Sequence, residues 1–427
     1  MITMPRVIAG MLLSAIFFGW LYAALLPWRA DQLAEAVKSG AIPAHAVPPL
    51  LWADEAPRLA AQNLLWSGSG NEQIIDDYLQ RSIIARPLYA PTWLNRAELA
   101  LRMGDRQAAD HYGDVARSLW PTRRQLLWRL AMFRIRLGDQ AKALGLLRDY
   151  LHAYPGDVFR AATVARRLES DPAKLVSLLL PASAPVGREA EYYLVGLLGF
   201  SLRIKDASLA HTVWQRLPER AKKKESILYP YINFMIALKL PDLAISAWNQ
   251  LRDSKLDLGR ITNPGFEEQL ANGGFGWRYQ EAKGAQLSRD KRIRYQGAYS
   301  LHIKFDGSEN IRYHHINQTI PVEPSGRYRL SGYWRGGSIT TRSGVFIDAY
   351  SLASRKNSYA RTDAKRSTWD WELFELQIPV PEDSHFIGIR VVRNSTDALD
   401  RLISGDLWLD DLQLESVEMG NMRASGL

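Results

Sequence analysis

Three stretches near the C-terminal end of this 427-residue chain alternate apolar with polar or aromatic side chains. Successive side chains of an extended strand point to opposite faces, so in the stretch 328–335 the residues Tyr328, Leu330 and Trp334 would share an apolar face. The opposite faces combine rings with hydrogen-bonding groups, which can hold a ligand by stacking and polar contacts. Packing in a core or at a sheet edge is the alternative for each aromatic residue. The candidate binding residues are Tyr313, His315, Asn317, Arg329, Tyr333, Arg335, Asp348 and Tyr350.

No catalytic motif stands out. The sequence has no phosphate-binding glycine loop, no serine-elbow motif and no histidine pair with zinc-ligand spacing. His314 and His315 are adjacent, so in a strand they would point to opposite faces and could not share a metal. Glycosidases need two carboxylates across a cleft, and Asp370, Glu372 and Glu375 are close in sequence but typical of surface strands. We therefore expect no enzymatic activity, with a glycan-processing enzyme as the least favoured alternative.

Composition indicates a globular protein, with 47% apolar and 23% charged residues. A chain of 427 residues should form two or three domains. The absence of cysteine excludes disulfides, thiolate metal sites and cysteine nucleophiles, but leaves the compartment open.

A 34-residue repeat organises the region from Pro87 to Pro155. Pro87, Pro121 and Pro155 are 34 residues apart, and the pair Gly104-Asp105 recurs as Gly138-Asp139. A fixed period of this length is typical of repeat architectures. It predicts a helix, a tight turn with glycine, a second helix, and a proline where that helix ends. Weaker copies follow at Asp171, Asp206 and Asp242.

Small residues recur within the units where two helices would cross closely. The matching positions are Trp93, Gly104, Ala109, Ala116 and Pro121 in one unit and Ala131, Gly138, Ala143 and Pro155 in the next. This pattern resembles the tetratricopeptide repeat. Arg96 and Gly113 depart from it, because a large apolar residue is usual there. The resemblance implies a stacked array that binds partner proteins.

The predicted array carries the positive charge of the chain. Residues 1–260 contain 33 Lys and Arg against 24 Asp and Glu, whereas the remainder has 21 of each. A basic array could attract nucleic acid, anionic lipid or acidic polymer. Without a nucleic-acid-binding signature we expect no nucleic-acid partner, and a solvated basic face beside a membrane. Five tryptophans would pack between helices or line a concave groove for a peptide or sugar chain: Trp93, Trp120, Trp128, Trp214 and Trp248.

An uncharged stretch from Val7 to Pro27 predicts a membrane anchor. As a helix it would span about 30 Å, the hydrocarbon thickness of a bilayer. Trp20, Tyr22 and Trp28 lie toward one end, where an aromatic belt is expected. A cleaved signal peptide is the alternative, although its apolar region would be shorter. The flanking basic residues nearly balance. The short lead favours a single pass through the inner membrane, with the bulk of the chain outside the cytoplasm, in the periplasm if the source is bacterial.

These patterns predict a multidomain fold. The order is an N-terminal transmembrane helix, an α-solenoid of tetratricopeptide-like hairpins and a C-terminal antiparallel β-sandwich. The predicted segments are residues 1–30 as the anchor, 31–70 as a linker with the first helices, 71–258 as the repeat array, 262–418 as the β domain, and 419–427 as a disordered tail.

After Asp257 glycine becomes frequent and apolar residues begin to alternate, which indicates many short strands and an all-β sandwich. The candidate strands are Ser300–Phe305, Ile311–Val322, Tyr328–Arg335, Val345–Ser351, Trp371–Val380, Phe386–Arg393 and Leu407–Glu415.

The β region has recognisable ends. It opens with Asn263-Pro-Gly-Phe-Glu267 and Gly276-Trp277, continues with Gly297-Ala-Tyr-Ser-Leu-His-Ile303, and closes with Leu407-Trp-Leu-Asp-Asp-Leu-Gln-Leu414. This order is similar to carbohydrate-binding modules of the galactose-binding-like jelly-roll class, over residues 262–418. The resemblance implies a jelly roll that binds polysaccharide through aromatic faces, with the three polar-aromatic faces lining one concave surface. Trp369 and Trp371 would pack in its core.

In that class a structural calcium ion often ties the first loop to the last strand. Glu267 and Asp410 or Asp411 match the positions of its ligands, and hard oxygen ligands suit Ca²⁺. The alternative is that these acids only cap turns.

Together these expectations describe a non-catalytic, membrane-anchored accessory or scaffold protein of envelope or extracellular polysaccharide biosynthesis or export. The repeats would hold partner proteins and the β domain would engage the glycan. The alternative is a pure protein-interaction scaffold whose β domain binds no sugar.

Overall fold

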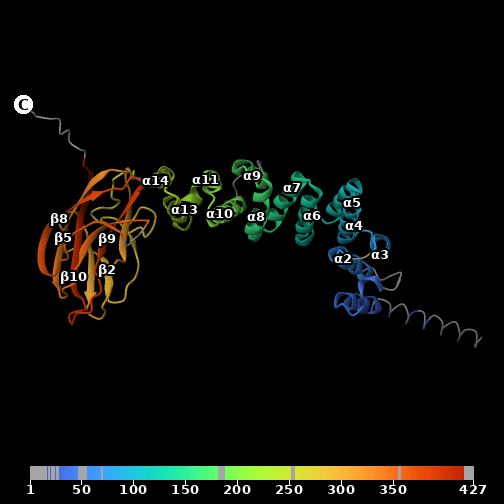
Figure 1. Cartoon of the computed structure of the whole chain (residues 1–427), viewed down its shortest axis with the longest axis horizontal. Helices are drawn as coiled ribbons and strands as arrows, with labels where there is room; N and C mark the ends of the chain where they lie inside the picture. Colours follow the sequence, from blue (N-terminus) through green and yellow to red (C-terminus); the bar gives the residue numbers. More distant parts are fainter. Residues whose placement is uncertain are drawn as a thin grey trace, which may run out of the picture. The chain divides into compact units, whose positions relative to one another are not determined.

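The computed structural model describes residues 17, 20, 25, 28–46, 55–68, 71–180, 188–251, 255–353 and 357–417. The chain forms two compact units, Met1–Phe200 and Ser201–Leu427. The first is helical, and the second combines helices with a β-sandwich (Figure 1).

Between Glu55 and Ala153, consecutive helices of the first unit pack in pairs. A helix over residues 28–38 and a short 3₁₀ turn, η1, precede these pairs. The elements are η1 (Ala44–Ala46), α2 (Glu55–Trp66), α3 (Glu72–Ala85), α4 (Ala90–Arg102), α5 (Arg106–Leu119), α6 (Arg124–Leu137), α7 (Gln140–Ala153), η2 (Pro155–Asp157), α8 (Val158–Leu168), α9 (Pro172–Leu179) and α10 (Arg188–Arg203).

The Gly-Asp pairs connect the two helices of a pair, as predicted. Gly104 and Gly138 adopt φ values of +83° and +87°, a left-handed conformation that glycine adopts without strain. The aspartates then cap the following helices, because Asp105 accepts from the backbone N–H of Ala108 at 2.9 Å and Asp139 does the same one unit later. Helices that begin at Ala90 and Arg106 therefore recur at Arg124 and Gln140.

The weaker copies of the repeat keep the capping aspartate only in part. Asp171 and Asp206 cap α9 and α11, whereas Asp242 is not a cap, because α14 begins one residue earlier at Pro241. Gly113, a departure from the repeat pattern, has a packing reason. A Cβ there would lie 2.9 Å from the ring of Phe133 and 3.1 Å from the guanidinium of buried Arg134.

Among the described residues, no helix combines the length and the apolar character needed to cross a bilayer. The predicted anchor, Val7 to Pro27, lies outside the described residues apart from Phe17, Trp20 and Leu25. The predicted tail, 419–427, also lies outside them.

The second unit begins with helices that pack against its own β-sandwich. The ring of Trp248 stacks on Tyr229 at 6.3 Å and meets Phe275 edge-on at 5.9 Å, and Phe275 lies 6.3 Å from Phe386 of the sandwich. Gly274 makes this approach possible, because a Cβ at that position would lie 2.6 Å from the Trp248 ring. The helices are α11 (Ala207–Arg216), α12 (Glu219–Lys222), α13 (Glu225–Ala237) and α14 (Pro241–Asn249).

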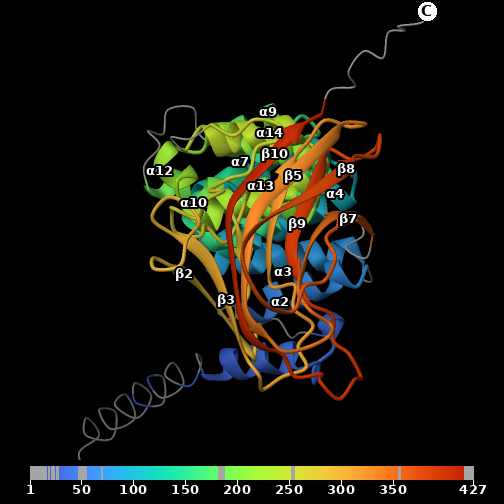
Figure 2. The same ribbon diagram turned by 90° about the vertical axis from the view of Figure 1, so that its left-hand side faces the viewer.

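Two five-stranded antiparallel sheets form the sandwich (Figure 2). The strand order is β1-β4-β9-β6-β7 in the first sheet and β2-β3-β10-β5-β8 in the second sheet. The strands are β1 (Arg278–Tyr279), β2 (Ala285–Asp290), β3 (Ser300–Asp306), β4 (Ile316–Pro321), β5 (Arg327–Ile339), β6 (Phe346–Ser351), β7 (Ser358–Arg361), β8 (Ser367–Pro379), β9 (Phe386–Val392) and β10 (Ser404–Ser416).

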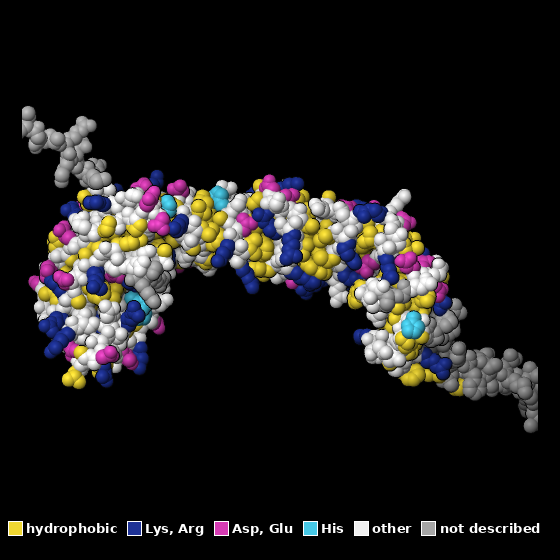
Figure 3. Space-filling view, in the orientation of Figure 1, with side chains coloured by type: hydrophobic (Ala, Val, Ile, Leu, Met, Phe, Trp, Pro, Cys, Tyr) yellow, Lys and Arg dark blue, Asp and Glu magenta, His cyan; other side chains and the backbone are white. Residues whose placement is uncertain are grey.

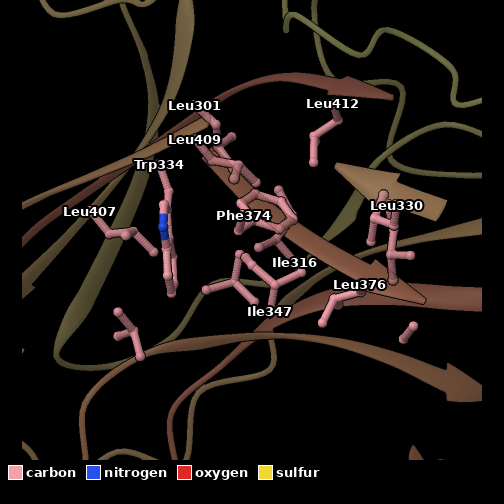
Figure 4. Packing of buried hydrophobic residues seen from close by; sticks show 14 of the residues in the cluster. Leu301, Ile316, Leu330, Trp334, Ile347, Phe374, Leu376, Leu407, Leu409 and Leu412 are labelled. Atoms are coloured by element: carbon pink, nitrogen blue, oxygen red, sulfur yellow. The ribbon is translucent and has the colours of Figure 1, made fainter. Parts of the chain in front are cut away.

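All seven predicted strands are present, with shifted ends. Three further strands, β1, β2 and β7, were not predicted because each is short and has at most two apolar residues. The two inner faces meet in one apolar core, in which Trp334, Phe374 and Leu407 lie close together (Figure 4). Trp334 is only 2% exposed, as expected for the apolar face of its strand.

Candidate functional site

The candidate site lies on the outer face of the first sheet, where β6 and β9 are neighbours. Their pairing places Asp348 opposite Arg390. Ile347 and Ala349 belong to the core, so Phe346 and Asp348 project to the outer face. The alternation of β6 therefore presents a ring and a carboxylate side by side.

A buried carboxylate organises this face. Asp348 is 2% exposed, and its Oδ2 accepts from Arg390 Nε at 2.8 Å and Nη2 at 2.6 Å. Its Oδ1 accepts from the Ser358 hydroxyl at 2.6 Å. Both oxygens have donors, and the two contacts from one guanidinium fix the orientation of Arg390.

Tyr350 supports the same guanidinium. Its ring lies across Gly388 of β9, where a Cβ would be 2.2 Å from the ring carbon Cζ. The guanidinium of Arg390 lies 4.3 Å from the ring centroid. With 1% of its surface exposed, Tyr350 holds Arg390 in place and offers no open ring face.

A hollow of about 330 Å³ opens beside the Asp348–Arg390 pair. Arg312, His314 and Arg361 line it together with that pair. Within the described parts of the chain, neither Arg312 nor Arg361 forms an ion pair with a carboxylate. The hollow thus contains three guanidinium groups and one carboxylate, and it suits a ligand that carries negative charge or many acceptor oxygens.

The predicted binding residues do not share one surface. A single strand's alternation shows which of its residues lie together, but not which sheet the strand joins. The prediction of one concave surface lined by all three faces is therefore wrong. Asn317, Asp348 and Tyr350 belong to the first sheet, whereas Arg329, Tyr333 and Arg335 belong to β5 in the second.

Tyr313 belongs to the core, the alternative considered for each aromatic residue. It is 2% exposed and meets Phe305 edge-on at 5.4 Å, and burial raises the pKa of its hydroxyl. His315 is half-buried beside it, with 5.1 Å between ring centroids, and burial lowers the pKa of its imidazole. Asn317 lines a separate crevice of about 320 Å³ between α13 and the first sheet.

The residues on β5 have partners of their own. Tyr333 stacks on Tyr295 at 3.6 Å between ring centroids. Trp371, expected in the core, lies 5.9 Å from Tyr295 and is half-buried.

The two predicted arginines of β5 are paired with acids. Arg329 contacts Glu415 at 2.5 Å, and Arg335 contacts Asp370 at 3.4 Å. This contrasts with the hollow, in which Arg312 and Arg361 have no such partner among the described residues.

Sequence reasoning missed Arg312, Arg361 and Arg390. Arg361 belongs to a short strand without alternation, and Arg312 precedes its strand. Arg390 is the one charged residue within the otherwise apolar run Phe386–Val392, and that isolation was the available signal.

Glu267 and Asp410 bind the loop of residues 291–299 through backbone N–H groups. Asp410 is fully buried, and its Oδ2 accepts from Tyr295 at 2.8 Å and Gln296 at 3.1 Å, while its Oδ1 accepts from Asp411 at 2.8 Å. Glu267 accepts from Ala298 at 2.9 Å. Burial raises the pKa of Asp410, and these hydrogen bonds act in the opposite direction.

The calcium ion predicted here does not fit these carboxylates well, because they already accept backbone hydrogen bonds. Among the described residues there is no group of three or more His, Asp or Glu side chains that could hold a metal ion. The structural calcium therefore stays a prediction, and the contacts present are those of acids that fix a loop.

Replacing Asp410 by asparagine should destabilise the loop of residues 291–299. The amide NH₂ would face N–H donors, leaving one or more buried donors unsatisfied, at a cost of about 2 kcal/mol. Amide hydrogen exchange of residues 291–299 would measure this loss. The matched control is Asp411→Asn, because Asp411 has φ +47°, a conformation that asparagine tolerates. Among the described residues, its side chain accepts a hydrogen bond only from Gln413. Equal exchange in the two variants would contradict the assigned role.

No protein-family model matches this chain, and no curated protein matches it. Among solved structures, the chain is similar to a family 4 carbohydrate-binding module, with 19% identity over 37% of this chain and 100% of the module and a TM-score of 0.29. It is also similar to TmCBM61 in complex with β-1,4-galactotriose (18% identity, 38% and 100% coverage, TM-score 0.27). A third match is the CBM22-1 xylan-binding domain of Xyn10C from Paenibacillus barcinonensis (15% identity, 36% and 91% coverage, TM-score 0.24). Because these TM-scores are low, the functional inferences that follow depend on this chain's own residues and not on these matches.

Proposed function

We propose that the β-sandwich binds a glycan in the hollow on the outer face of its first sheet. The observation that carries the proposal is the buried Asp348–Arg390 pair beside Arg312 and Arg361. A fixed guanidinium next to two without carboxylate partners can donate several hydrogen bonds to sugar hydroxyls or carboxylates. Phe346, with the Arg361 guanidinium 5.7 Å from its ring centroid, adds an apolar floor.

In this proposal the chain is a non-catalytic accessory protein of polysaccharide biosynthesis or export. The first unit would hold protein partners, and a membrane anchor at Val7 to Pro27 would keep the chain at the inner membrane, with its bulk outside the cytoplasm. The motif resemblances at both ends of the β region support this role, as does the pairing of a helical array with a β-sandwich.

The glycan-binding role can be tested with the full chain on immobilised acidic and neutral glycans. We expect Arg361→Ala to weaken retention about tenfold or more, since a charge-assisted hydrogen bond contributes about 1.5–3 kcal/mol. Arg292→Ala, an exposed arginine on a loop outside the hollow, is the matched control and should bind normally.

A third variant, Tyr333→Ala, distinguishes the two faces. If Tyr333→Ala lost retention while Arg361→Ala kept it, the ligand would lie on the second sheet and the hollow would be the wrong site. Absence of retention on every glycan, with co-purifying membrane proteins, would favour the pure protein-interaction scaffold.

A further inference from the structure

We propose that the helical unit carries a second binding site, a groove for the chain of an acidic polysaccharide. The groove has a volume of about 930 Å³, near the top of the range for small-molecule sites. Residues of α2, α4, α6, α7 and α8 and of the connections between helices line it, and all of it lies within the first unit. Figure 3 shows Lys and Arg side chains gathered among apolar ones over the helical segments.

The lining consists of arginines stacked on aromatic rings. The Arg160 guanidinium lies 3.8 Å from the centroid of the Trp128 ring. Four further pairs have separations between 5.4 and 5.7 Å, within the range of cation–π contact. These pairs are Arg58 with Tyr89, Arg123 with Trp120, Arg124 with Tyr154, and Arg129 with Trp66.

Hydrogen bonds hold several of these arginines in place. Arg129 is half-buried, and its Nη2 donates to Asn95 at 2.8 Å and to Glu98 at 3.4 Å. Burial lowers the pKa of the Arg129 guanidinium, and Glu98 opposes that shift. Arg124 contacts Asp157 at 2.5 Å. The guanidinium planes are therefore oriented before a ligand arrives, which reduces the entropy lost on binding.

Positive charge exceeds negative charge in the groove. Five arginines contribute to the lining, and their carboxylate partners are Glu55, Glu98 and Asp157. Arg123 and Arg160 form no ion pair with any described residue of the chain, and their side chains are exposed. The groove therefore has a surplus of oriented donors for carboxylates, in agreement with the concentration of net charge in residues 1–260.

The row of stacked guanidiniums favours a stiff polymer with a carboxylate on each unit. Trp66 is 64% exposed and can accept the apolar face of a sugar ring. A stiff uronate chain also loses less conformational freedom per carboxylate than an acidic peptide does. The choice of sugar over peptide rests in part on the function proposed for the β-sandwich.

The test uses the full chain and an oligogalacturonate as the probe. We expect the double variant Arg123→Gln/Arg160→Gln to weaken binding tenfold or more, and Trp66→Ala to weaken it at least threefold. The charge-matched control Arg148→Gln/Arg167→Gln changes two arginines that do not line the groove, and its binding should change less than twofold. Circular dichroism would establish that each variant is folded. Because Trp66→Ala changes no charge, it tests the groove independently of the arginine variants.

Three further probes identify the polymer. A neutral galacto-oligosaccharide should bind at least tenfold more weakly than the oligogalacturonate. Poly-L-glutamate and a single-stranded oligonucleotide test the other polymers. If either one bound as tightly as the oligogalacturonate and was weakened to the same extent by Trp66→Ala, the assignment to sugar would be overturned. If Arg123→Gln/Arg160→Gln bound the oligogalacturonate as tightly as the control double variant does, the groove would not be the binding site.

Repeating the measurements in the Arg361→Ala background separates this inference from the proposed function. Loss of oligogalacturonate binding only in the groove variants would support the groove, whichever glycan the hollow binds. Loss only in Arg361→Ala would assign this polymer to the hollow and overturn the groove.

Discussion

Replacing Arg393 by methionine should lower the free energy of unfolding of the β-sandwich by about 4 kcal/mol, since charge-assisted hydrogen bonds from a buried donor are lost and their acceptors are left unsatisfied. Arg393 is 0% exposed and has no carboxylate partner in the described parts of the chain. Its guanidinium donates to Asn310 Oδ1 at 2.8 Å and to the carbonyl oxygens of Ile311 and Arg401 at 2.6 Å each. Burial lowers its pKa, which Asp400 partly opposes.

These three hydrogen bonds connect the end of β9 with the segments that precede β4 and β10. Arg393→Lys should recover only part of the lost stability, because one ammonium cannot reproduce the geometry of the guanidinium fork. The matched control is Arg401→Met, because the Arg401 side chain is exposed and only its carbonyl takes part. Urea titration with amide exchange on β9 and β10 would measure the difference. Equal unfolding midpoints for Arg393→Met and Arg401→Met would show that the three hydrogen bonds do not stabilise the sandwich.

Replacing Trp248 by alanine should release the α13–α14 helices from the sandwich. Trp248 is 2% exposed and lies between Tyr229 and Phe275, so its removal leaves a cavity and should cost about 3–5 kcal/mol. The measurement is limited proteolysis of residues 250–257 together with amide exchange of α14.

A second variant tests the same contact without deleting the ring. Gly274→Ala would place a Cβ 2.6 Å from Trp248 at a φ of +57°, and it should also loosen α14. Trp371→Ala is the control, since that ring is half-buried on the second sheet and its loss should leave α14 protected. If α14 stayed protected in both Trp248→Ala and Gly274→Ala, other contacts would hold the helices.

Local signals predicted the elements of this fold well. Gly104 and Gly138 were expected to lie in turns, because their spacing matched that of the prolines. These features depend on residues close in sequence, and their physical causes act within one or two helical turns.

The arrangement of the strands was beyond such signals. β4, β6 and β9 share one sheet, while β5 lies in the other, and this assignment depends on contacts between residues far apart in sequence. The burial of Tyr313 and Tyr350 follows from that arrangement, and so does the convergence of Arg312, Arg361 and Arg390. The groove was considered from Trp120 and Trp128, but its arginines come from α2, from α6 with its N-cap, and from α8, which only the folded chain brings together.

The position of β10 between β3 and β5 has a consequence for the order of folding. In the helical pairs of the first unit, the residues in contact lie within about one repeat of each other in the sequence. By contrast, β10 brings together residues such as His302 and Asp406, which are 104 positions apart. Local contacts form faster than distant ones, and chains generally fold from the N-terminal side during synthesis. Until β10 leaves the ribosome, β3 and β5 each have an unpaired edge that can recruit other strands. The newly made chain is therefore most vulnerable to aggregation in the interval just before its last strand is inserted.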